Sequence, residues 1–452
     1  MSNNYLDTLA EFICETTLSD IEPSALLHLR HIIADTLAAC AVGNQESSMR
    51  ELLLIQLGAC KAGVATVIGT GATINPMDAA MLNASAGCWL ELDEGNLASN
   101  GHPGIQVIPT ALAVAQHLNS SGSDFLLACA IGYEVCARIG MSCEMRMSIH
   151  PHGTYGVVGA AVAAGKLYGL EGNAMRELVN LAGSSPLAGN RQSMKEGATV
   201  RNWYASHSSS MGQMAVRLIQ SGFTGPHDGL TPTCNDVLFD HFRPDILIKD
   251  LGRNWLLAKG YIKLYGCGRP IHAAIDALRA ALETMGSSNH WPTAEEIEAI
   301  HIRGFKFLAF LNSLDIRNAF STRFSTPFAL ASVLVNRSYG IECFDEYAAH
   351  NPTIHSLMKR ISLTEDATFT TSFPDQQLCE VKITLTNGQH LFGKCEIIRG
   401  EPSNPARPEE YYDKFVALTS RIWPEREILP LYEAAFYPEK LNSLRGLGIF
   451  LN

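Results

Sequence analysis

An acidic cluster followed by a histidine, in the first quarter of the chain, has the residue types of an acid/base site. The cluster is Glu91, Asp93 and Glu94, and His102 follows it within the sequence Gly-His-Pro-Gly. A histidine beside carboxylates can serve as a general acid or base, and the start of the helix expected from Ile105 could hold an anion. A solvated, acidic helix end with a capping loop explains the same residues equally well, so both interpretations stand.

Two further histidines, His150 and His152, precede a run of small residues that predicts a buried helix. The positive end of a helix dipole favours the neutral imidazole, which makes a base at neutral pH. Two histidines alone are weak evidence for a metal and no third ligand stands out, so no metal is expected. The glycines at 153, 156 and 159 lack the strand and the Gly-x-Gly pair of a dinucleotide motif, and they favour close helix contacts.

Two cationic segments complete the candidate chemistry. Arg201, in Glu-Gly-Ala-Thr-Val-Arg-Asn, could hold a carboxylate through two parallel hydrogen bonds, although a structural ion pair would explain it as well. A later segment, at an expected domain boundary, would line a ligand cleft. It supplies Lys263, Tyr265, Cys267, Arg269 and His272. The thiol in this set could be a nucleophile, but a small buried thiol is the commoner fate.

Helices are expected to position the first three of these segments. From Tyr5 to about Gly222 the buried faces are rich in Ala, Gly and Ser, and strand-like alternation is almost absent. Pro23 and Pro76 stand at helix-start positions. Further helices are predicted over residues 105–118, 125–139, 157–168, 173–182 and 209–220.

The pattern changes after Gly260. Period-two alternation over 296–302 predicts a strand, and the stretches on either side of Asn387-Gly388 predict a hairpin. Helices are predicted between these strands, over 273–282 and 326–335. We therefore predict a helical domain over residues 1–260, completed by 399–452 through helices at 408–420 and around Tyr432. A smaller α+β domain should occupy residues 261–398.

Composition excludes several classes of protein. The 452 residues include 34 Lys+Arg and 45 Asp+Glu, a net charge of −11, which opposes binding to nucleic acid or to an anionic membrane surface. No apolar run approaches the roughly 20 residues of a membrane span. The twelve cysteines are scattered without Cys-x-x-Cys spacing, and the first residues are acidic, unlike a signal peptide. We expect buried thiols and a cytoplasmic location.

Taken in order, the four motif segments resemble the MmgE/PrpD family, which includes 2-methylcitrate dehydratase, cis-aconitate decarboxylase and iminodisuccinate epimerase. The resemblance extends over nearly the whole chain, and the later segment Arg323-Phe-Ser-Thr-Pro-Phe is similar to one in the family's lid domain. It implies a mainly α protein: an all-helical domain built from both chain ends with an inserted α+β lid. It also implies a homodimer and an active site between the domains that needs no cofactor.

The resemblance assigns roles to individual positions. The family's two active-site histidines fall on His102 and His150, and its third- and fourth-motif lysines fall on Arg201 and Lys263. The chain departs from the family pattern in having Glu91 for Asp, Gly95 for Thr, Arg201 for Lys and His152 for Thr or Ser. A guanidinium stays protonated and cannot donate a proton near pH 7, which places a dehydratase ahead of a decarboxylase.

The expected function is a cofactor-independent lyase of a small di- or tricarboxylate, most like a 2-methylcitrate-type dehydratase. The alternatives are a decarboxylase of an aconitate-like acid, an epimerase or isomerase of a dicarboxylate, and a dimer that binds a carboxylate without turnover. The expected catalytic residues are His102, His150, Lys263 and Asp93. The expected substrate-binding residues are Glu91, Glu94, His152, Arg201, Tyr265, Cys267, Arg269 and His272.

Overall fold

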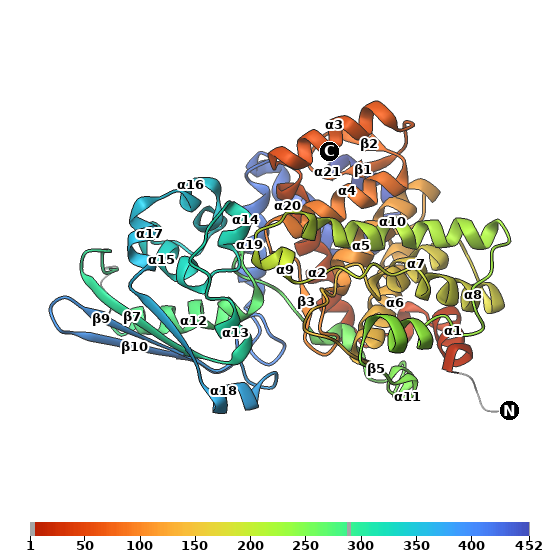
Figure 1. Ribbon diagram of the computed structural model, residues 1–452. Coiled ribbons are helices and arrows are strands. Elements are labelled where there is room, and N and C mark those ends of the chain that lie inside the picture. The colour runs from red at the N-terminus through yellow and green to blue at the C-terminus, as the bar shows by residue number, and fades with distance from the viewer. Residues whose placement is uncertain (1–4, 287–290, 452) are drawn as a thin grey trace.

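The chain folds into a helical domain and a smaller α+β domain that lie side by side (Figure 1). The structure is a computed structural model that describes residues 5–286 and 291–451. One apolar core joins residues between Leu6 and Ile262 with residues between Phe415 and Leu451. A second core runs from Tyr265 to Ile398 and also takes Met194. The predicted fold class, mainly α with an α+β part, is confirmed.

Most of the helical domain comes from the first half of the chain. Its helices there are α1 (Tyr5–Glu15), α2 (Pro23–Gly43), α3 (Ser47–Ala59), α4 (Pro76–Trp89), α5 (Pro103–Leu118), α6 (Gly122–Met141), α7 (Gly156–Leu167), α8 (Gly172–Gly183), α9 (Gln192–Lys195), α10 (Val200–Gln220) and α11 (Pro244–Ile248). Pro23 and Pro76 open α2 and α4 as predicted, because a proline at the first helical position loses no helical hydrogen bond. Asn75 caps α4 through its side chain.

The helix α10 begins nine residues earlier than predicted. Its first turns bury small polar side chains in place of a regular apolar stripe. Ser206 Oγ donates to the carbonyl of Met81 at 2.6 Å, and Ser208 Oγ donates to Gln106 Oε1 at 2.8 Å. These hydrogen bonds satisfy hydroxyls that the hydrophobic pattern would place in solvent.

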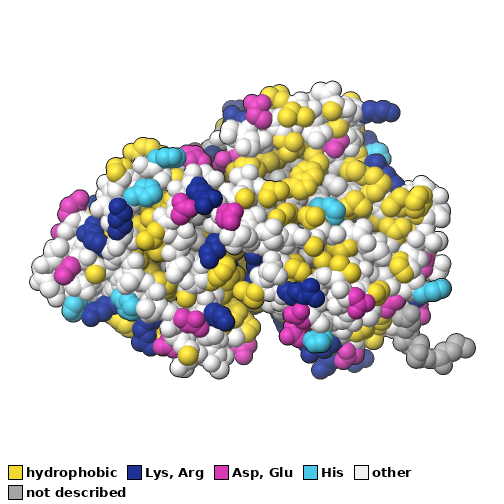
Figure 2. Space-filling view, in the orientation of Figure 1, with side chains coloured by type: hydrophobic (Ala, Val, Ile, Leu, Met, Phe, Trp, Pro, Cys, Tyr) yellow, Lys and Arg dark blue, Asp and Glu magenta, His cyan; other side chains and the backbone are white. Residues whose placement is uncertain are grey.

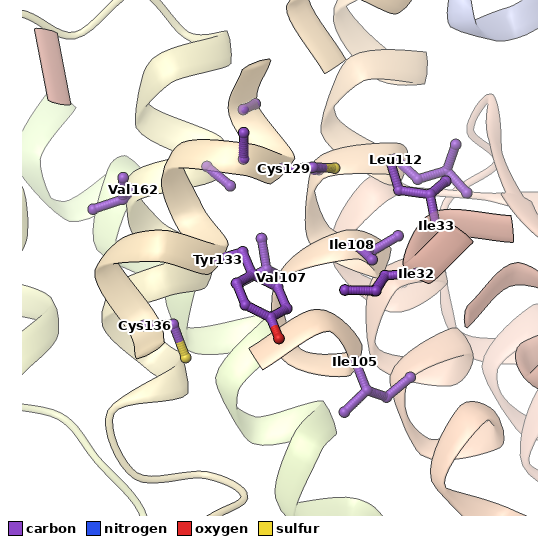
Figure 3. Close-up of a cluster of buried hydrophobic side chains, with 14 of the residues drawn as sticks. Ile32, Ile33, Ile105, Val107, Ile108, Leu112, Cys129, Tyr133, Cys136 and Val162 are labelled. Atoms are coloured by element: carbon purple, nitrogen blue, oxygen red, sulfur yellow. The ribbon is translucent and has the colours of Figure 1, made fainter. Parts of the chain in front are cut away.

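The helix α5 lies at the centre of this domain. Its side chains Ile108 and Leu112 lie near Ile32 and Ile33 of α2, and its Val107 lies near Tyr133 of α6, all buried (Figure 3). The neighbouring helices α6 and α7 pack backbone to backbone, because a Cβ on Gly132 would lie 2.7 Å from the carbonyl oxygen of Gly159. The close helix contacts expected from the small residues are therefore present.

The helix α2 is long and apolar enough to cross a membrane. Within this domain, however, most of its apolar length is buried. Asp35 on the same helix forms a buried ion pair with Lys414, with 2.5 Å between Oδ1 and Nζ. These contacts identify α2 as a core helix of the domain.

The α+β domain is built around a four-stranded sheet. The strands β7 (Ile297–Gly304), β8 (Ile361–Glu365), β9 (Cys379–Leu385) and β10 (His390–Cys395) lie in the order β10-β9-β7-β8. The helices are α12 (Arg269–Glu283), α13 (Lys306–Phe310), α14 (Ala319–Thr322), α15 (Thr326–Asn336), α16 (Glu346–Ala349), α17 (Pro352–Met358) and α18 (Ala367–Ser372). The predicted hairpin is confirmed in β9 and β10, which turn at Gly388 with φ of 84°. The sequence did not predict β8, which pairs parallel to β7.

The end of the chain returns to the helical domain. The helices α19 (Pro408–Thr419) and α20 (Glu425–Phe436) pack on α2, and α21 (Leu444–Leu451) packs on α5. Short ladders tie loops together: β1 (Ala65–Val67) with β2 (Ala72–Ile74), β3 (Gly95–Asn96) with β6 (Gly260–Tyr261), and β4 (Cys143–Glu144) with β5 (His241–Phe242). The β3–β6 ladder brings the acidic cluster to the start of the second domain. Ladders of two or three residues are too short for a period-two pattern to reveal.

The buried pair of Asp35 and Lys414 gives a test of how the tail is held. Lys414→Met should lower the free energy of unfolding by about 3 kcal/mol, because it leaves a buried carboxyl group without its partner. Urea unfolding measures the change. The double variant Asp35→Leu/Lys414→Met should recover most of the loss, and a double variant as unstable as Lys414→Met would contradict the explanation.

Candidate active site

A cavity of about 230 Å³ lies where the two domains meet. On the face shown in Figure 2 the surface is hollowed along this boundary, with Lys and Arg side chains beside it. The helical domain contributes Glu91, His102, His150, Arg191 and Arg201 to the lining, and the chain from β6 onward contributes Tyr261, Lys263, Arg269, Phe307, Gln377 and Glu401. Five predicted site residues besides Glu91 thus reach the cavity, from segments far apart in sequence: His102, His150, Arg201, Lys263 and Arg269.

Two carboxylates and two cations share one buried cluster at the base of the cavity. Lys263 Nζ donates to Glu91 Oε2 at 2.9 Å and to Asp93 Oδ1 at 3.2 Å. The guanidinium of Arg201 contacts the other oxygen of Glu91. Glu91 itself has φ of 53°, a left-handed conformation that is strained for a non-glycine residue. The cluster is therefore compensated in charge and held at a backbone position of raised energy.

The charge states in the cluster follow from its contacts. Burial alone would lower the pKa of Lys263, but Asp93 and Glu91 outweigh it and raise that pKa above its ordinary value. Burial alone would raise the pKa of Asp93, yet Lys263 and His102 hold it well below its usual range. Lys263 and Asp93 are thus both charged at neutral pH. Glu94 differs, because burial raises its pKa well above the ordinary value and so favours the neutral carboxyl group.

His102 lines the cavity and has a ring nitrogen free to react. Its Nδ1 faces the backbone carbonyl of Glu94 and lies 3.0 Å from Asp93 Oδ2. A carbonyl oxygen only accepts, so Nδ1 carries the hydrogen and Nε2 of the neutral ring carries the lone pair. Within the described residues Nε2 makes no hydrogen bond, and the side chain is 14% exposed at the cavity. This nitrogen can accept or donate a proton, and Asp93 stabilises the protonated ring.

The anion site expected at the start of α5 is already filled. The carboxyl oxygen Oε1 of Glu94 accepts the backbone N–H of Gly104 in the first turn of that helix. A Cβ at Gly104 would lie 2.5 Å from this oxygen, so a larger residue here would displace the carboxyl group from its present position. The interpretation of this helix end as a ligand site is wrong, because the protein's own side chain occupies it.

His150 and His152 lie in turns before α7, which begins only at Gly156. The expected effect of the helix dipole is therefore wrong as the cause of their neutral state. Burial and the charge of Arg201 lower both pKa values well below the usual one. Arg201 Nε donates to His150 Nε2 at 3.2 Å, and the backbone N–H of His152 lies 3.2 Å from His150 Nδ1. A neutral imidazole has one lone pair, so His150 is less available as a base than His102.

His152 completes a row of three imidazole rings. Its ring centroid lies 4.8 Å from those of both His102 and His150. One ligand atom from each of Cys88, Asp93 and His152 falls within 4.8 Å of the others, a spacing that could hold a metal ion. Burial keeps the Cys88 thiol protonated by raising its pKa, and Lys263 contacts the same carboxylate. A cation at this point would meet a fixed positive charge, so the set does not favour a metal.

The remaining predicted residues divide at the start of α12. Arg269 lines the cavity, pairs with Glu401 at 2.7 Å and lies over the ring of Tyr261. Tyr265, Cys267 and His272 lie outside the cavity lining. Glu94 and His152 also lie outside it, so the cavity gives no support to a contact of these five side chains with substrate. The hydroxyl of Tyr265 donates to Asp276 at 2.7 Å, and Cys267 is fully buried in the second core. His272 Nδ1 lies 3.3 Å from Nη1 of Arg269.

Several lining residues were missed from sequence. Tyr261, Gln377, Glu401 and Arg191 all border the cavity. Tyr261 stands two positions before Lys263, and its position next to this motif could have identified it as a site residue. Arg191 lies in a loop with no periodic pattern, so nothing in its neighbourhood marked it.

Both halves of the chain match one family. Residues 7–244 match the MmgE/PrpD N-terminal domain and residues 265–434 match the MmgE/PrpD C-terminal domain. The chain belongs to the MmgE/PrpD family, and the family together with this site defines an enzyme of the lyase type.

Similarity to individual relatives is low in identity. The chain is 20% identical to the cis-aconitate decarboxylase of Aspergillus terreus over 457 residues, covering 96% of this chain and 93% of that protein. It is 23% identical to the cis-aconitate decarboxylase of Homo sapiens over 333 residues, covering 71% and 68%. The cis-aconitate decarboxylase-like protein oryM of Aspergillus oryzae is 25% identical over 295 residues, or 61% of each chain.

The buried histidines predict a loss of stability in mild acid. Because burial lowers the pKa of His152 in the folded protein, the unfolded chain binds protons first as the pH falls. The free energy of unfolding is therefore unaffected by this ring above about pH 6.5. Below that pH it falls, by at most about 1.4 kcal/mol per pH unit for this histidine. His152→Thr should flatten the decline in the free energy of unfolding between pH 7 and 5. His350→Thr, at an exposed histidine, is the control, and equal slopes in both variants would contradict the explanation.

Proposed function

We propose that this enzyme removes CO2 from a small unsaturated tricarboxylate of the aconitate type. The observation that carries the proposal is His102, whose Nε2 faces a cationic cavity while Nδ1 is fixed by Glu94 and Asp93. The similarity to cis-aconitate decarboxylases of Aspergillus terreus and Homo sapiens supports the same reaction. Dehydration, placed first from the sequence, becomes the second candidate.

The geometry suits a proton transfer coupled to carbon–carbon cleavage. The bond to one carboxylate breaks, and its electron pair forms a new carbon–carbon double bond. The electrons of the original double bond then take a proton at carbon from the protonated Nε2 of His102. One proton is consumed for each CO2 released, and solvent restores it to the ring. Asp93 stabilises the imidazolium before the transfer, and Lys263 and Arg201 lie beside the negative charge that develops.

Arg201 acts in this scheme through its charge alone. The absence of the family's lysine at this position was the reason for preferring dehydration, because a guanidinium does not donate a proton near pH 7. His102 supplies that proton in the proposed scheme, so the substitution leaves the acid in place. His150, which accepts a hydrogen bond from Arg201 Nε, orients the guanidinium toward Glu91.

Dehydration of a 2-methylcitrate-type acid remains the alternative. The same Nε2, in the neutral ring, could remove a proton beside a carboxylate and later protonate the departing hydroxyl. Epimerisation would need the same removal of a proton and then the return of a proton to the opposite face of that carbon. A homodimer and a cytoplasmic location are also part of the proposal, the latter supported by twelve free thiols. Light scattering of the purified protein tests the dimer.

Proton NMR in D2O distinguishes these reactions. The panel is cis-aconitate, trans-aconitate, citrate, 2-methylcitrate and an amino-dicarboxylate. New vinyl signals from cis-aconitate, with release of CO2, are the expected result. Loss of water from 2-methylcitrate would replace the first candidate by the second, and deuterium exchange without a new skeleton would favour an epimerase. A raised melting temperature without any conversion would contradict a catalytic role.

The role of His102 predicts a specific loss of turnover. His102→Gln should lower kcat by roughly a hundredfold or more, because glutamine cannot carry the proton. His117→Gln, at an exposed histidine near the far end of the same helix, should leave kcat unchanged. Circular dichroism checks that both variants fold. Turnover by His102→Gln at the wild-type rate would remove His102 from the mechanism.

A further inference from the structure

Arg191 is a cavity residue held rigidly beside the segment that carries His150. Its backbone N–H donates to the carbonyl of Ser148 at 3.0 Å, and the backbone N–H of His150 donates to the carbonyl of Gly189 at 2.8 Å. The guanidinium is fixed in turn, because Nε donates to the carbonyl of Ile149 at 2.9 Å. The side chain is thus positioned by the backbone and needs no acidic partner to order it.

The charge of Arg191 is uncompensated, unlike that of the other cations of the cavity. Lys263 and Arg201 pair with the acidic cluster, and Arg269 pairs with Glu401. Within residues 5–286 and 291–451, no carboxylate lies at ion-pair distance from Arg191. Burial without such a partner lowers the pKa of its guanidinium below the ordinary value, although it stays protonated at neutral pH.

The two terminal nitrogens of Arg191 have only weak partners. Nη1 lies 3.7 Å from the sulfur of Met147 and Nη2 lies 3.6 Å from the sulfur of Met145. A thioether is a poor hydrogen-bond acceptor, whereas a carboxylate can accept from both nitrogens in parallel. Phe307 of α13 lies under the guanidinium, 5.6 Å from its central carbon, and shields it from water on that side. A carboxylate that binds here could accept hydrogen bonds from both Nη1 and Nη2, at a guanidinium that is shielded from water on one face.

We propose that Arg191 binds one carboxylate of the substrate through Nη1 and Nη2. The inference rests on the proposed function in taking the substrate to be a small polycarboxylate. The carboxylate would lie at the domain boundary, at the edge of a guanidinium of the helical domain whose face lies over an aromatic ring of the α+β domain. Cations that are already paired within the protein would then provide the field for the reaction, and Arg191 would provide the anchor.

Binding of tricarballylate, a saturated tricarboxylate that has no double bond to react, tests the anchor by calorimetry. Arg191→Gln should weaken binding about tenfold to a hundredfold, the usual effect of losing charge-assisted hydrogen bonds. Arg191→Lys keeps the charge without the planar pair of donors and should fall between wild type and Arg191→Gln. Arg146→Gln is the matched control, because this arginine pairs with Asp240 outside the cavity lining and changes net charge equally.

Three results would overturn the inference: no binding by the wild type, wild-type affinity in Arg191→Gln, or equal losses in Arg191→Gln and Arg146→Gln. If Arg191→Gln does not fold, the affinity of Arg191→Lys for tricarballylate is the test. Wild-type affinity in that variant would overturn the proposed contact of Nη1 and Nη2 with a carboxylate. With a substrate that is turned over, Arg191→Gln should raise KM and change kcat less. Failure of cis-aconitate to react would refute the proposed decarboxylation and leave the tricarballylate measurement intact.

Discussion

The shared contact of Lys263 with Glu91 and Asp93 is the interaction on which the site depends. Removing an ammonium group and two carboxylates from water is costly, and only mutual contact offsets the loss of hydration. Here Lys263 comes from the chain entering the α+β domain, and both carboxylates come from the loop after α4. The same ion contacts therefore neutralise the buried charges and fix the entry to the second domain against the first.

The three adjacent imidazoles show how environment separates chemically identical groups. His102 donates from Nδ1 and leaves Nε2 toward the cavity, His150 accepts from Arg201, and His152 is fully buried near Asp93. Only His102 combines access to the cavity with a carboxylate that supports its protonated form. Sequence spacing alone cannot make this distinction, because it depends on which ring nitrogen each backbone or side-chain partner engages.

What the sequence predicted well rests on local rules. Prolines at helix starts placed α2 and α4, and Asn387-Gly388 placed the turn between β9 and β10. The resemblance brought Lys263 and Arg201 into consideration. These successes share a short-range signal or an ordered set of motifs.

The predictions that failed concern the direction in which a side chain points, which the order of residues in the sequence does not determine. Lys263 and Arg269 reach the cavity, whereas Tyr265 and Cys267, which lie between them, turn into the second core. Arg191 went unnoticed because its position follows from hydrogen bonds to residues more than forty positions away. Each error concerns the direction of a side chain, which depends on long-range packing.

Gly95 and Tyr261 face each other in the β3–β6 ladder, and their fit limits how this site can change. A Cβ at position 95 would lie 2.2 Å from the phenol oxygen of Tyr261, so the threonine typical of the resembling motif has no space here. Tyr261 in turn lies under the guanidinium of Arg269, 4.3 Å from its central carbon. The two positions are therefore coupled in packing: a side chain at 95 requires Tyr261 to shift or to become smaller, and either change disturbs the surface on which Arg269 rests.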